Sequence, residues 1–420
     1  MAMSPLNTSL EFQMPTDQPD LDAFRTRCRT FLDEHATGLS TCADDSLEEA
    51  GRRRVEESRA FLMAASEAGL AGIIYPAEYG GQGLDIEHDK VWREERANHP
   101  DMTMEYNISH GMCLPMLNEY GSTAQKEAHL SDVISGRSLW CQMFSEPGAG
   151  SDVASLQMKA ERDGDTWVLN GQKVWTTLAH LGHYGITIAR TDPSVAKHAG
   201  ISMFIVPLDA PGVEIRPIHQ IDGGRRFNEV FFTDVAVPLE NLLGELNNGW
   251  NMATAMLMYE RVVIGTGSSS GIQHEFADEL IEAATERGRI TDPVIRQGLM
   301  HLYTMETCRS LVAMRTRADL KAGKTPGPGG SLGKLLATQI TILNRELSMN
   351  IVGPSSIAWE EPEGFHWARR CLGSVVLGIA GGTTEIQKNI IGDRVLGLPR
   401  DLSVDRGVPF NELKVSTHSG

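Results

Sequence analysis

The sequence predicts an α+β protein with three consecutive domains, helical at both ends and β-rich in the middle. In the first third, apolar residues recur at helical spacing, as at Phe24, Cys28 and Phe31. Short β-rich runs such as Ile201 to Pro207 follow, separated by glycine-containing turn pairs, and favour a small antiparallel barrel or sandwich. Long apolar-periodic helical segments return from Gly249 onward. The expected domain boundaries are residues 1–138, 139–238 and 239–420.

The composition argues against several classes of protein. The 420 residues are enough for two or three domains, on a prior of roughly 100 to 200 residues per domain. The chain has 38 Lys and Arg residues and 55 Asp and Glu residues, so its net charge is -17. This negative charge argues against binding to nucleic acid or to an anionic membrane surface. There is no apolar run of about 18 residues, so we expect no membrane span. The acidic N-terminus resembles no targeting signal, and the scattered cysteines suggest reduced thiols, so we expect a cytoplasmic protein.

The most informative stretch is an apolar segment that ends in a loop of small residues. Leu139 to Phe144 is mostly apolar and predicts a strand. Pro147-Gly-Ala-Gly150 then breaks the strand just before Ser151. A loop of this kind lets a planar ligand and an acyl chain come close to backbone N–H groups.

A second stretch follows at Asn170-Gly171. This dipeptide is a strong signal for a two-residue hairpin turn, because both positions tolerate a positive φ. The sequence therefore predicts a hairpin that pairs residues 167–169 with residues 173–175.

These two stretches resemble the flavin-contacting signatures of the acyl-CoA dehydrogenase family, and three further motifs occur in the family's order. The five stretches are Tyr75-Pro-Ala-Glu-Tyr-Gly-Gly-Gln-Gly83, Ser145-Glu-Pro-Gly-Ala-Gly-Ser-Asp152, Asn170-Gly-Gln-Lys-Val-Trp-Thr-Thr177, Phe231-Phe-Thr-Asp-Val-Ala-Val-Pro238 and Gly381-Gly-Thr-Thr-Glu-Ile-Gln387. Five ordered motifs are far more specific than any single one. The resemblance implies the family's three-domain fold with a C-terminal four-helix bundle, an FAD cofactor, an acyl-CoA substrate and an electron-transfer flavoprotein as acceptor.

The resemblance also implies the cofactor contacts of the β domain. The backbone and hydroxyl around Phe144 and Ser145, and the hydroxyl of Thr177, are expected to hydrogen-bond the isoalloxazine ring, while Trp175 shields its face. Ser151 is expected at both the cofactor and the substrate. Without the family pattern, Trp175 and Thr177 would be interpreted as an ordinary strand pair.

The catalytic base is the most informative departure from the family pattern. Many members carry the catalytic Glu in an E-G-T triplet, but here Gly381 stands at the Glu position. A second family solution places Glu directly before Arg on the helix after the β domain, and Glu260-Arg261 matches it. Apolar neighbours such as Met258 would desolvate Glu260 and raise its pKa toward that of a useful base. The alternatives are a Glu–Arg pair on a solvated face, or Glu385 as the base.

The same pattern implies how the substrate is held. The backbone N–H of Gly381 would polarise the thioester carbonyl together with a ribityl hydroxyl of the flavin, and Gly382 would let the CoA chain pass close. Tyr259 and Arg261, which flank the candidate base, are expected to line the substrate site with Ser151. The alternative for the two glycines is a simple loop before a helix.

The contacts expected across a subunit interface are less complete. Thr383, Glu385 and Gln387 would reach the FAD of a neighbouring subunit, Glu385 near its adenosine end. The family pattern R-x-x-F-G-x-P-x-x-x-x-Q is incomplete here: Arg287 matches its first position, but the Phe-Gly that should follow is absent. A second family pattern, Q-x-x-G-G, is replaced by a different segment that contains Gly353. Incomplete motifs of this kind resemble those in subunits of α2β2 dehydrogenases, in which a homologous partner subunit completes each FAD site. We therefore expect a homotetramer or an α2β2 heterotetramer.

Three interpretations of function follow. The leading one is an FAD-dependent acyl-CoA dehydrogenase, which Glu260 favours. A non-catalytic or half-site subunit of an α2β2 enzyme is favoured by the eroded motifs around Arg287. A flavin oxidase or monooxygenase is less favoured, because no additional domain follows Thr383. The sequence does not define the acyl group.

Overall fold

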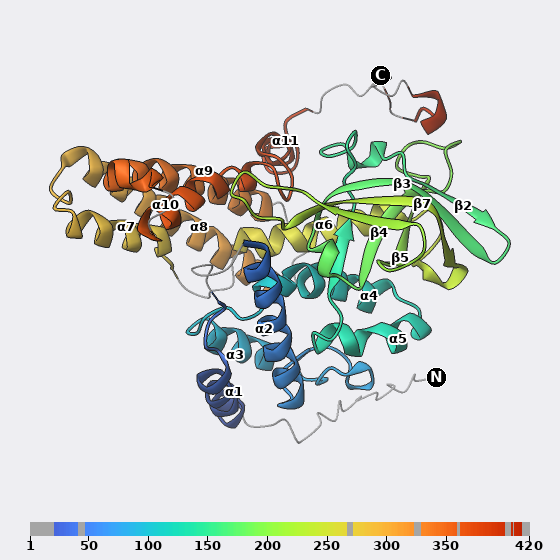
Figure 1. The fold of residues 1–420 in the computed structure, drawn as a ribbon, viewed down its shortest axis with the longest axis horizontal. Helices are drawn as coiled ribbons and strands as arrows, with labels where there is room; N and C mark the ends of the chain where they lie inside the picture. The colour runs from blue at the N-terminus through green and yellow to red at the C-terminus, as the bar shows by residue number, and fades with distance from the viewer. Residues whose placement is uncertain are drawn as a thin grey trace, which may run out of the picture.

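The computed structural model describes residues 21–40, 47–266, 272–322, 329–358, 362–399, 405 and 407–413. Figure 1 shows a helical N-terminal part, a central sheet beside it, and an elongated bundle of C-terminal helices that extends away from the sheet. Among the described residues, none of the helices combines the length and the apolarity required to cross a bilayer.

The N-terminal part is built from helices whose apolar faces meet in one core. They are α1 (Leu21–His35), α2 (Leu47–Glu67), α3 (Ile86–Arg96), α4 (Leu114–Tyr120) and α5 (Thr123–Ile134). The stripe predicted at Phe24, Cys28 and Phe31 is buried on α1, as the helical spacing requires. Asp85 caps α3 by accepting backbone N–H bonds, and Ser122 with Gln125 forms a capping box on α5. A π-helical turn at Ser109–Cys113 joins this core to the sheet.

The middle part is one eight-stranded sheet. Its strands are β1 (Trp140–Met143), β2 (Lys159–Asp163), β3 (Thr166–Thr177), β4 (Tyr184–Arg190), β5 (Ile201–Pro207), β6 (Val213–Pro217), β7 (Phe227–Pro238) and β8 (Leu242–Leu243). The order is β6-β7-β3-β2-β4-β5-β8, and β1 pairs with β4. Most pairs are antiparallel, whereas β1–β4 and β2–β4 are parallel, so the sheet is mixed.

The hairpin predicted at Asn170-Gly171 is wrong. Both residues lie inside the continuous strand β3, and the turn instead lies at residues 164–165, between β2 and β3. The side chain of Asn170 bonds to both the backbone N–H and the carboxylate of Asp234 on β7, and a bulge in the β3–β7 pairing falls between Leu169 and Gly171. Gly171 has a φ of 150°, and a Cβ there would lie 2.8 Å from the Met158 backbone. The dipeptide thus forms a bulge where two strands approach closely.

The C-terminal part is helical. Its helices are α6 (Gly249–Thr266), α7 (Glu275–Glu286), α8 (Pro293–Lys321), α9 (Gly329–Val352), α10 (Pro362–Gly373) and α11 (Thr384–Arg394). The helix α6 leaves the sheet and runs toward the bundle, where α7, α8, α9 and α10 share an apolar core. The buried residues Met252, Ala253 and Met256 of α6 belong to the same core as the N-terminal helices, so α6 joins the parts of the molecule.

The C-terminal segment after α11 returns to the sheet. Phe410 is buried, and its backbone N–H donates to the Val195 carbonyl at 2.8 Å. The Arg190 guanidinium lies 3.7 Å from the centre of the Phe410 ring. Lys197 forms ion pairs with Asp405 at 2.5 Å and with Asp152 at 2.9 Å. The C-terminal segment therefore contacts and stabilises the loop after β1, which carries the small-residue motif.

Candidate active site

A buried ion pair fixes the loop that follows β1. The Lys173 ammonium, fully buried on β3, donates to the Phe144 carbonyl at 3.0 Å and to the Glu146 carboxylate at 2.8 Å. The same carboxylate also accepts from the backbone N–H groups of Gln157 and Met158, at 2.6 and 3.0 Å. Burial lowers the pKa of Lys173, and Glu146 opposes that shift. Both ends of the loop are therefore held in place around β3.

Trp175 is the exposed residue at the centre of this region. Its indole is 60% exposed and meets the edge of Phe227, with ring centres 6.1 Å apart. Its φ is 62°, in the left-handed region that bulky residues rarely adopt. The β3–β7 register shifts between Lys173 and Thr176, which places Trp175 on a bulge. An exposed aromatic side chain on strained backbone is a feature of a ligand site.

The other residues expected at the cofactor lie around Trp175. The Phe144 side chain is buried, so its backbone is the part available to a ligand. Ser145 and Thr177 are half-buried, and the Ser145 carbonyl accepts from the Val174 N–H at 2.9 Å. Ser151 is exposed at the end of the loop. β1, β3 and the loop after β1 thus bring together the cofactor contacts named from the sequence.

The helix α6 carries the candidate base one turn after two buried methionines. Met252 and Met256 are fully buried, and position 260 lies one helical turn after Met256 on the same side. The side chains of Glu260 and Arg261 lie outside the described residues. The helix thus extends through position 260 with the spacing that separates Met252 from Met256.

Tyr259 lines a pocket of ≈ 340 Å³ beside α6, whose other lining residues are Ile74, Tyr75, Pro115, Asn118 and Glu119. The Tyr259 hydroxyl donates to the Glu119 carboxylate at 2.9 Å. Burial and this carboxylate raise the pKa of Tyr259 to about 12, so the phenol keeps its proton at neutral pH. The pocket therefore combines apolar walls with a proton-bearing polar pair.

The glycine pair forms a sharp turn before α11. Gly381 has a φ of 66° and Gly382 a φ of 88°, so both adopt the conformation that favours glycine. Thr383 caps α11 through its hydroxyl. Glu385 is exposed, and its own N–H and the Thr383 hydroxyl hold the pKa of this carboxyl below its usual value. A carboxylate stabilised in this way is a weak base, which favours Glu260 over Glu385.

Comparison with known proteins identifies the family of the chain. Profiles of the acyl-CoA dehydrogenase N-terminal, middle and C-terminal domains match residues 18–137, 141–235 and 247–396. The chain belongs to the acyl-CoA dehydrogenase family. Acyl-CoA dehydrogenase IpdE1 of Mycobacterium tuberculosis is 38% identical over 389 residues, which are 91% of this chain and 99% of that relative.

Solved structures of acyl-CoA dehydrogenases have the same fold. The "Tcur3481-Tcur3483 steroid ACAD" superposes with a TM-score of 0.75 at 28% identity and covers 92% of this chain and 100% of that chain. The "ChsE4-ChsE5 complex from Mycobacterium tuberculosis" gives a TM-score of 0.72 at 26% identity, over 92% of this chain and 100% of that chain. The family consists of FAD-dependent oxidoreductases, so the protein is an FAD-dependent acyl-CoA dehydrogenase.

The residues present in this acyl-CoA dehydrogenase fit FAD. Trp175 offers an exposed aromatic face, and a Cβ at Gly148 or Gly150 would meet nothing within 4 Å, so the loop is open to a planar group. The residues expected to hold the ring are Phe144, Ser145, Trp175 and Thr177. When bound, FAD supplies the acceptor for the hydride that leaves the acyl chain.

The residues expected at a neighbour's FAD lie in the C-terminal part. Arg287 follows α7 and donates to the Ala283 carbonyl at 3.1 Å. Figure 1 shows α7 at the end of the bundle far from the sheet. Gly353 follows α9 with a φ of 69°. Gln387 is fully buried in this chain and donates to the Gly381 carbonyl at 2.9 Å.

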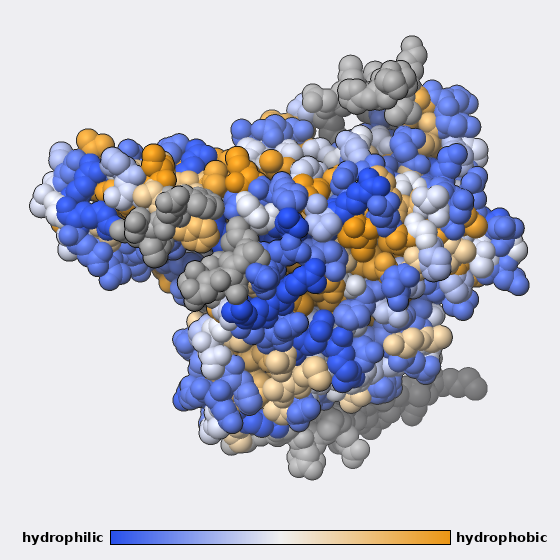
Figure 2. Space-filling model, viewed as in Figure 1, coloured by the Kyte–Doolittle hydropathy of each residue, from blue (hydrophilic) through white to orange (hydrophobic). Residues whose placement is uncertain are grey.

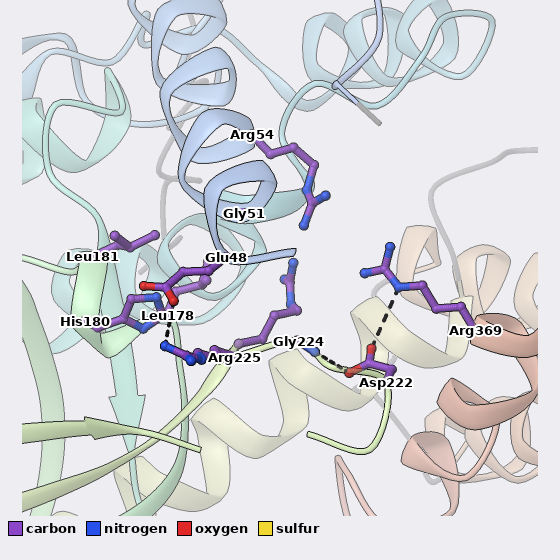
Figure 3. A pocket seen from close by; sticks show the side chains of 11 residues that line it. Glu48, Gly51, Arg54, Leu178, His180, Leu181, Asp222, Gly224, Arg225 and Arg369 are labelled. Atoms are coloured by element: carbon purple, nitrogen blue, oxygen red, sulfur yellow. Dashed lines mark hydrogen bonds and ion pairs between the residues drawn. The ribbon is translucent and has the colours of Figure 1, made fainter. Parts of the chain in front are cut away.

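Sequence reasoning missed a network of arginine ion pairs at the junction of the three parts. Glu105 is buried between Arg54, at 2.9 Å, and Arg226, at 2.6 Å. Figure 3 shows two further pairs beside them, Arg225 with Glu48 and Arg369 with Asp222. The adjoining cavity is ≈ 20 Å³, which holds about one water molecule. The network thus joins α2, the segment between β6 and β7, and α10, and has no room for a ligand.

Proposed function

We propose that this acyl-CoA dehydrogenase desaturates the Cα–Cβ bond of an acyl-CoA thioester, with Glu260 as the base that removes the α-proton. The observation that carries the proposal is the place of position 260 on α6, one helical turn after the buried Met256, combined with glycine at position 381. A carboxylate at an apolar position has its pKa raised toward that of an effective base. FAD, held by Phe144, Ser145, Trp175 and Thr177, would supply the acceptor for the β-hydrogen as a hydride.

The other residues hold the substrate. The backbone N–H of Gly381 donates to the thioester oxygen and stabilises the negative charge that develops when the α-proton leaves. Gly382 has no side chain to obstruct the CoA chain. Tyr259, Arg261 and Ser151 are the proposed substrate contacts. Arg287, Gly353, Thr383 and Glu385 are proposed to contact the FAD of a neighbouring subunit.

The test begins with an absorbance spectrum of the purified protein, followed by anaerobic titration with a panel of acyl-CoA thioesters. We expect a flavin spectrum and loss of its visible absorbance with at least one thioester. Reoxidation by an electron-transfer flavoprotein but not by oxygen would distinguish a dehydrogenase from an oxidase. A flavin that no thioester reduces, with or without a homologous partner subunit, would contradict the proposal.

A half-site subunit is the second candidate function. Arg287 lacks the Phe-Gly that follows the matching Arg in the family pattern, and it directly follows α7, which lies at the end of the bundle far from the sheet. Two of the similar structures are named as pairs of proteins, Tcur3481-Tcur3483 and ChsE4-ChsE5. These observations support an α2β2 assembly with a homologue.

A further inference from the structure

We propose that Lys334 is a positioning residue for the reaction, because it holds the Gly382 carbonyl, fixes the turn that presents the Gly381 N–H, and places a buried positive charge beside the thioester oxygen. The proposal rests on the proposed function, in which Gly381 contacts that oxygen. It adds a buried charge to a turn that otherwise consists of uncharged backbone.

Lys334 lies on α9 and has no exposed surface. Its ammonium donates to the Gly382 carbonyl at 2.8 Å and also to the Leu377 carbonyl. Thr338, one turn later on α9, donates to the same Leu377 carbonyl at 2.9 Å. Burying an ammonium among backbone carbonyls is costly, so a lysine at this position indicates a requirement beyond packing.

Gln387 holds the same turn through both glycine carbonyls. Its Nε2 donates to the Gly381 carbonyl at 2.9 Å and to the Gly382 carbonyl at 3.3 Å. Only the NH₂ end of the amide can face two carbonyl oxygens, which fixes the orientation of the side chain. A Cβ at Gly382 would lie 2.7 Å from this Nε2, so glycine is required for the contact.

The contacts of Lys334 and Gln387 with the glycine carbonyls determine where the N–H groups of the turn point. In a trans peptide the C=O and the following N–H point in opposite directions. Because the Gly381 and Gly382 carbonyls face Gln387 and Lys334, the N–H groups of Gly382 and Thr383 face away from them. On the other side of Gly381, the Ala380 N–H is bonded to the Val376 carbonyl at 2.9 Å. The Gly381 N–H therefore lies between two restrained parts of the backbone.

The positive charge also acts through the peptide. The Lys334 ammonium at the Gly382 carbonyl polarises the Gly382–Thr383 peptide and makes the Thr383 N–H a stronger donor, while its charge acts on the oxygen at the Gly381 N–H through space. Successive N–H groups in a glycine turn already form a concave site for negative charge. Lys334 thus supports the site that stabilises the developing oxyanion, without contacting the substrate.

The test compares Lys334→Met with Thr338→Val, which removes the neighbouring donor to Leu377 but leaves the contact to Gly382. The first measurement is a crystal structure of each variant, which requires no activity. We expect the Gly381–Gly382 peptides to rotate in Lys334→Met and to stay in place in Thr338→Val. An unchanged turn in Lys334→Met would overturn the positioning role.

The second measurement uses an acyl-CoA analogue with sulfur at the β position, which can lose its α-proton but has no β-hydrogen to transfer. The pH at which the bound analogue ionises reports how well the site stabilises the oxyanion. We expect this apparent pKa to rise by about one unit in Lys334→Met and to stay unchanged in Thr338→Val, with the rate of flavin reduction falling on the order of 10-fold. An unchanged apparent pKa would overturn the electrostatic role.

If Lys334→Met does not fold, the same two measurements are made on Lys334→Gln, whose side chain keeps an NH₂ donor but carries no charge. If the wild-type chain binds FAD but no thioester reduces it, the proposed function fails. The crystal structures would still decide whether Lys334 sets the turn.

Discussion

At the residue scale, the site depends on lysines that are fully buried. Lys173 and Lys334 each donate to backbone carbonyls next to the predicted contacts of the cofactor and the substrate. Neither was recognised from sequence as a structural residue, because a lysine in a β or helical pattern normally indicates an exposed face. The distinguishing signal for Lys334 was its place among apolar residues of a helix, between Leu332 and Leu335.

Glu260→Gln is expected to keep FAD but to lower the rate of flavin reduction by the acyl-CoA substrate on the order of 100-fold or more. The amide keeps the shape of the side chain but cannot accept the α-proton. The rate is measured by stopped-flow absorbance under anaerobic conditions, with Glu385→Gln as the control. A native rate in Glu260→Gln with a loss in Glu385→Gln would assign the base to the segment after Gly381.

Gly381→Glu added to Glu260→Gln moves the carboxylate to the family's other position. Because Gly381 has a φ of 66°, the new side chain costs roughly 1 kcal/mol of backbone strain, and recovery of the rate is expected to be partial. The recovery is measured by the same stopped-flow assay. A double variant no faster than Glu260→Gln would indicate that the two positions do not face the same α-carbon, or that the new side chain obstructs it.

Lys173→Met is expected to destabilise the fold by about 3 kcal/mol or more, because it leaves the Glu146 carboxylate buried without its cation. FAD content should fall with it, since Lys173 also holds the Phe144 carbonyl. Thermal unfolding and flavin absorbance measure the two effects. Arg216→Met, which breaks the exposed pair with Glu214 on β6, is the control and should leave both the unfolding temperature and the FAD content nearly unchanged. Equal effects of the two substitutions would contradict the role of the buried pair.

At the element scale, the π-helical turn at Ser109–Cys113 connects the helical core to β1. The Ser109 hydroxyl bonds both the N–H and the carbonyl of Trp140, at 2.7 and 3.0 Å. His110 Nε2 donates to the Val133 carbonyl at 2.7 Å. Burial lowers the pKa of His110 to about 4, so the imidazole is neutral at pH 7.

This shift predicts how the turn responds to acid. The unfolded chain takes up the proton near pH 6.5 and the folded chain only near pH 4, so stability is lost as the pH falls between these values. His110→Gln can still donate to Val133 but does not titrate. Between about pH 7.5 and pH 5, the wild type is expected to lose about 2 kcal/mol more than the variant, measured by denaturation at both pH values. The same pH dependence in both proteins would contradict a buried neutral His110.

The elements show what could be predicted from the sequence. The apolar spacing of α1 and the short β-rich runs depend on local pattern, and the helical and β regions were recognised from it. The hairpin at Asn170-Gly171 was wrong because its conformation depends on Asp234 and Met158, which are outside the local pattern. The conformation of the segment around Phe410 likewise depends on its contact with Arg190. It could therefore not be predicted from the sequence of that segment alone.

At the scale of the whole molecule, the three parts are held together by contacts that no local pattern reports. The ion pairs around Glu105 join the N-terminal part to the sheet, and Arg369 with Asp222 joins the sheet to the bundle. Apolar packing of α6 adds a further connection between the helical parts and the sheet. The position of Glu260 relative to Trp175 and Gly381 therefore depends on the assembled chain rather than on one domain.

The C-terminal helices also have apolar residues on their surface. Figure 2 shows hydrophobic residues along the upper side of the bundle. Val294, Ile357 and Ile379 are 78%, 67% and 69% exposed, respectively. Exposed apolar residues in this number are typical of a surface that another subunit covers.

We therefore predict assembly beyond a monomer, with FAD content that depends on the partner. Sedimentation should show a species larger than the 46.0 kDa chain at micromolar concentration. If the protein is a homotetramer, the chain alone should carry about one FAD per subunit. If it is half of an α2β2 enzyme, the chain alone should carry less, and co-expression with a homologous subunit should restore it, because Arg287 would then face the partner's cofactor. Arg287→Ala in that complex should lower FAD content without changing the sedimentation, since the residue would hold the cofactor rather than the interface. A monomer with a full complement of FAD would contradict both forms of the prediction.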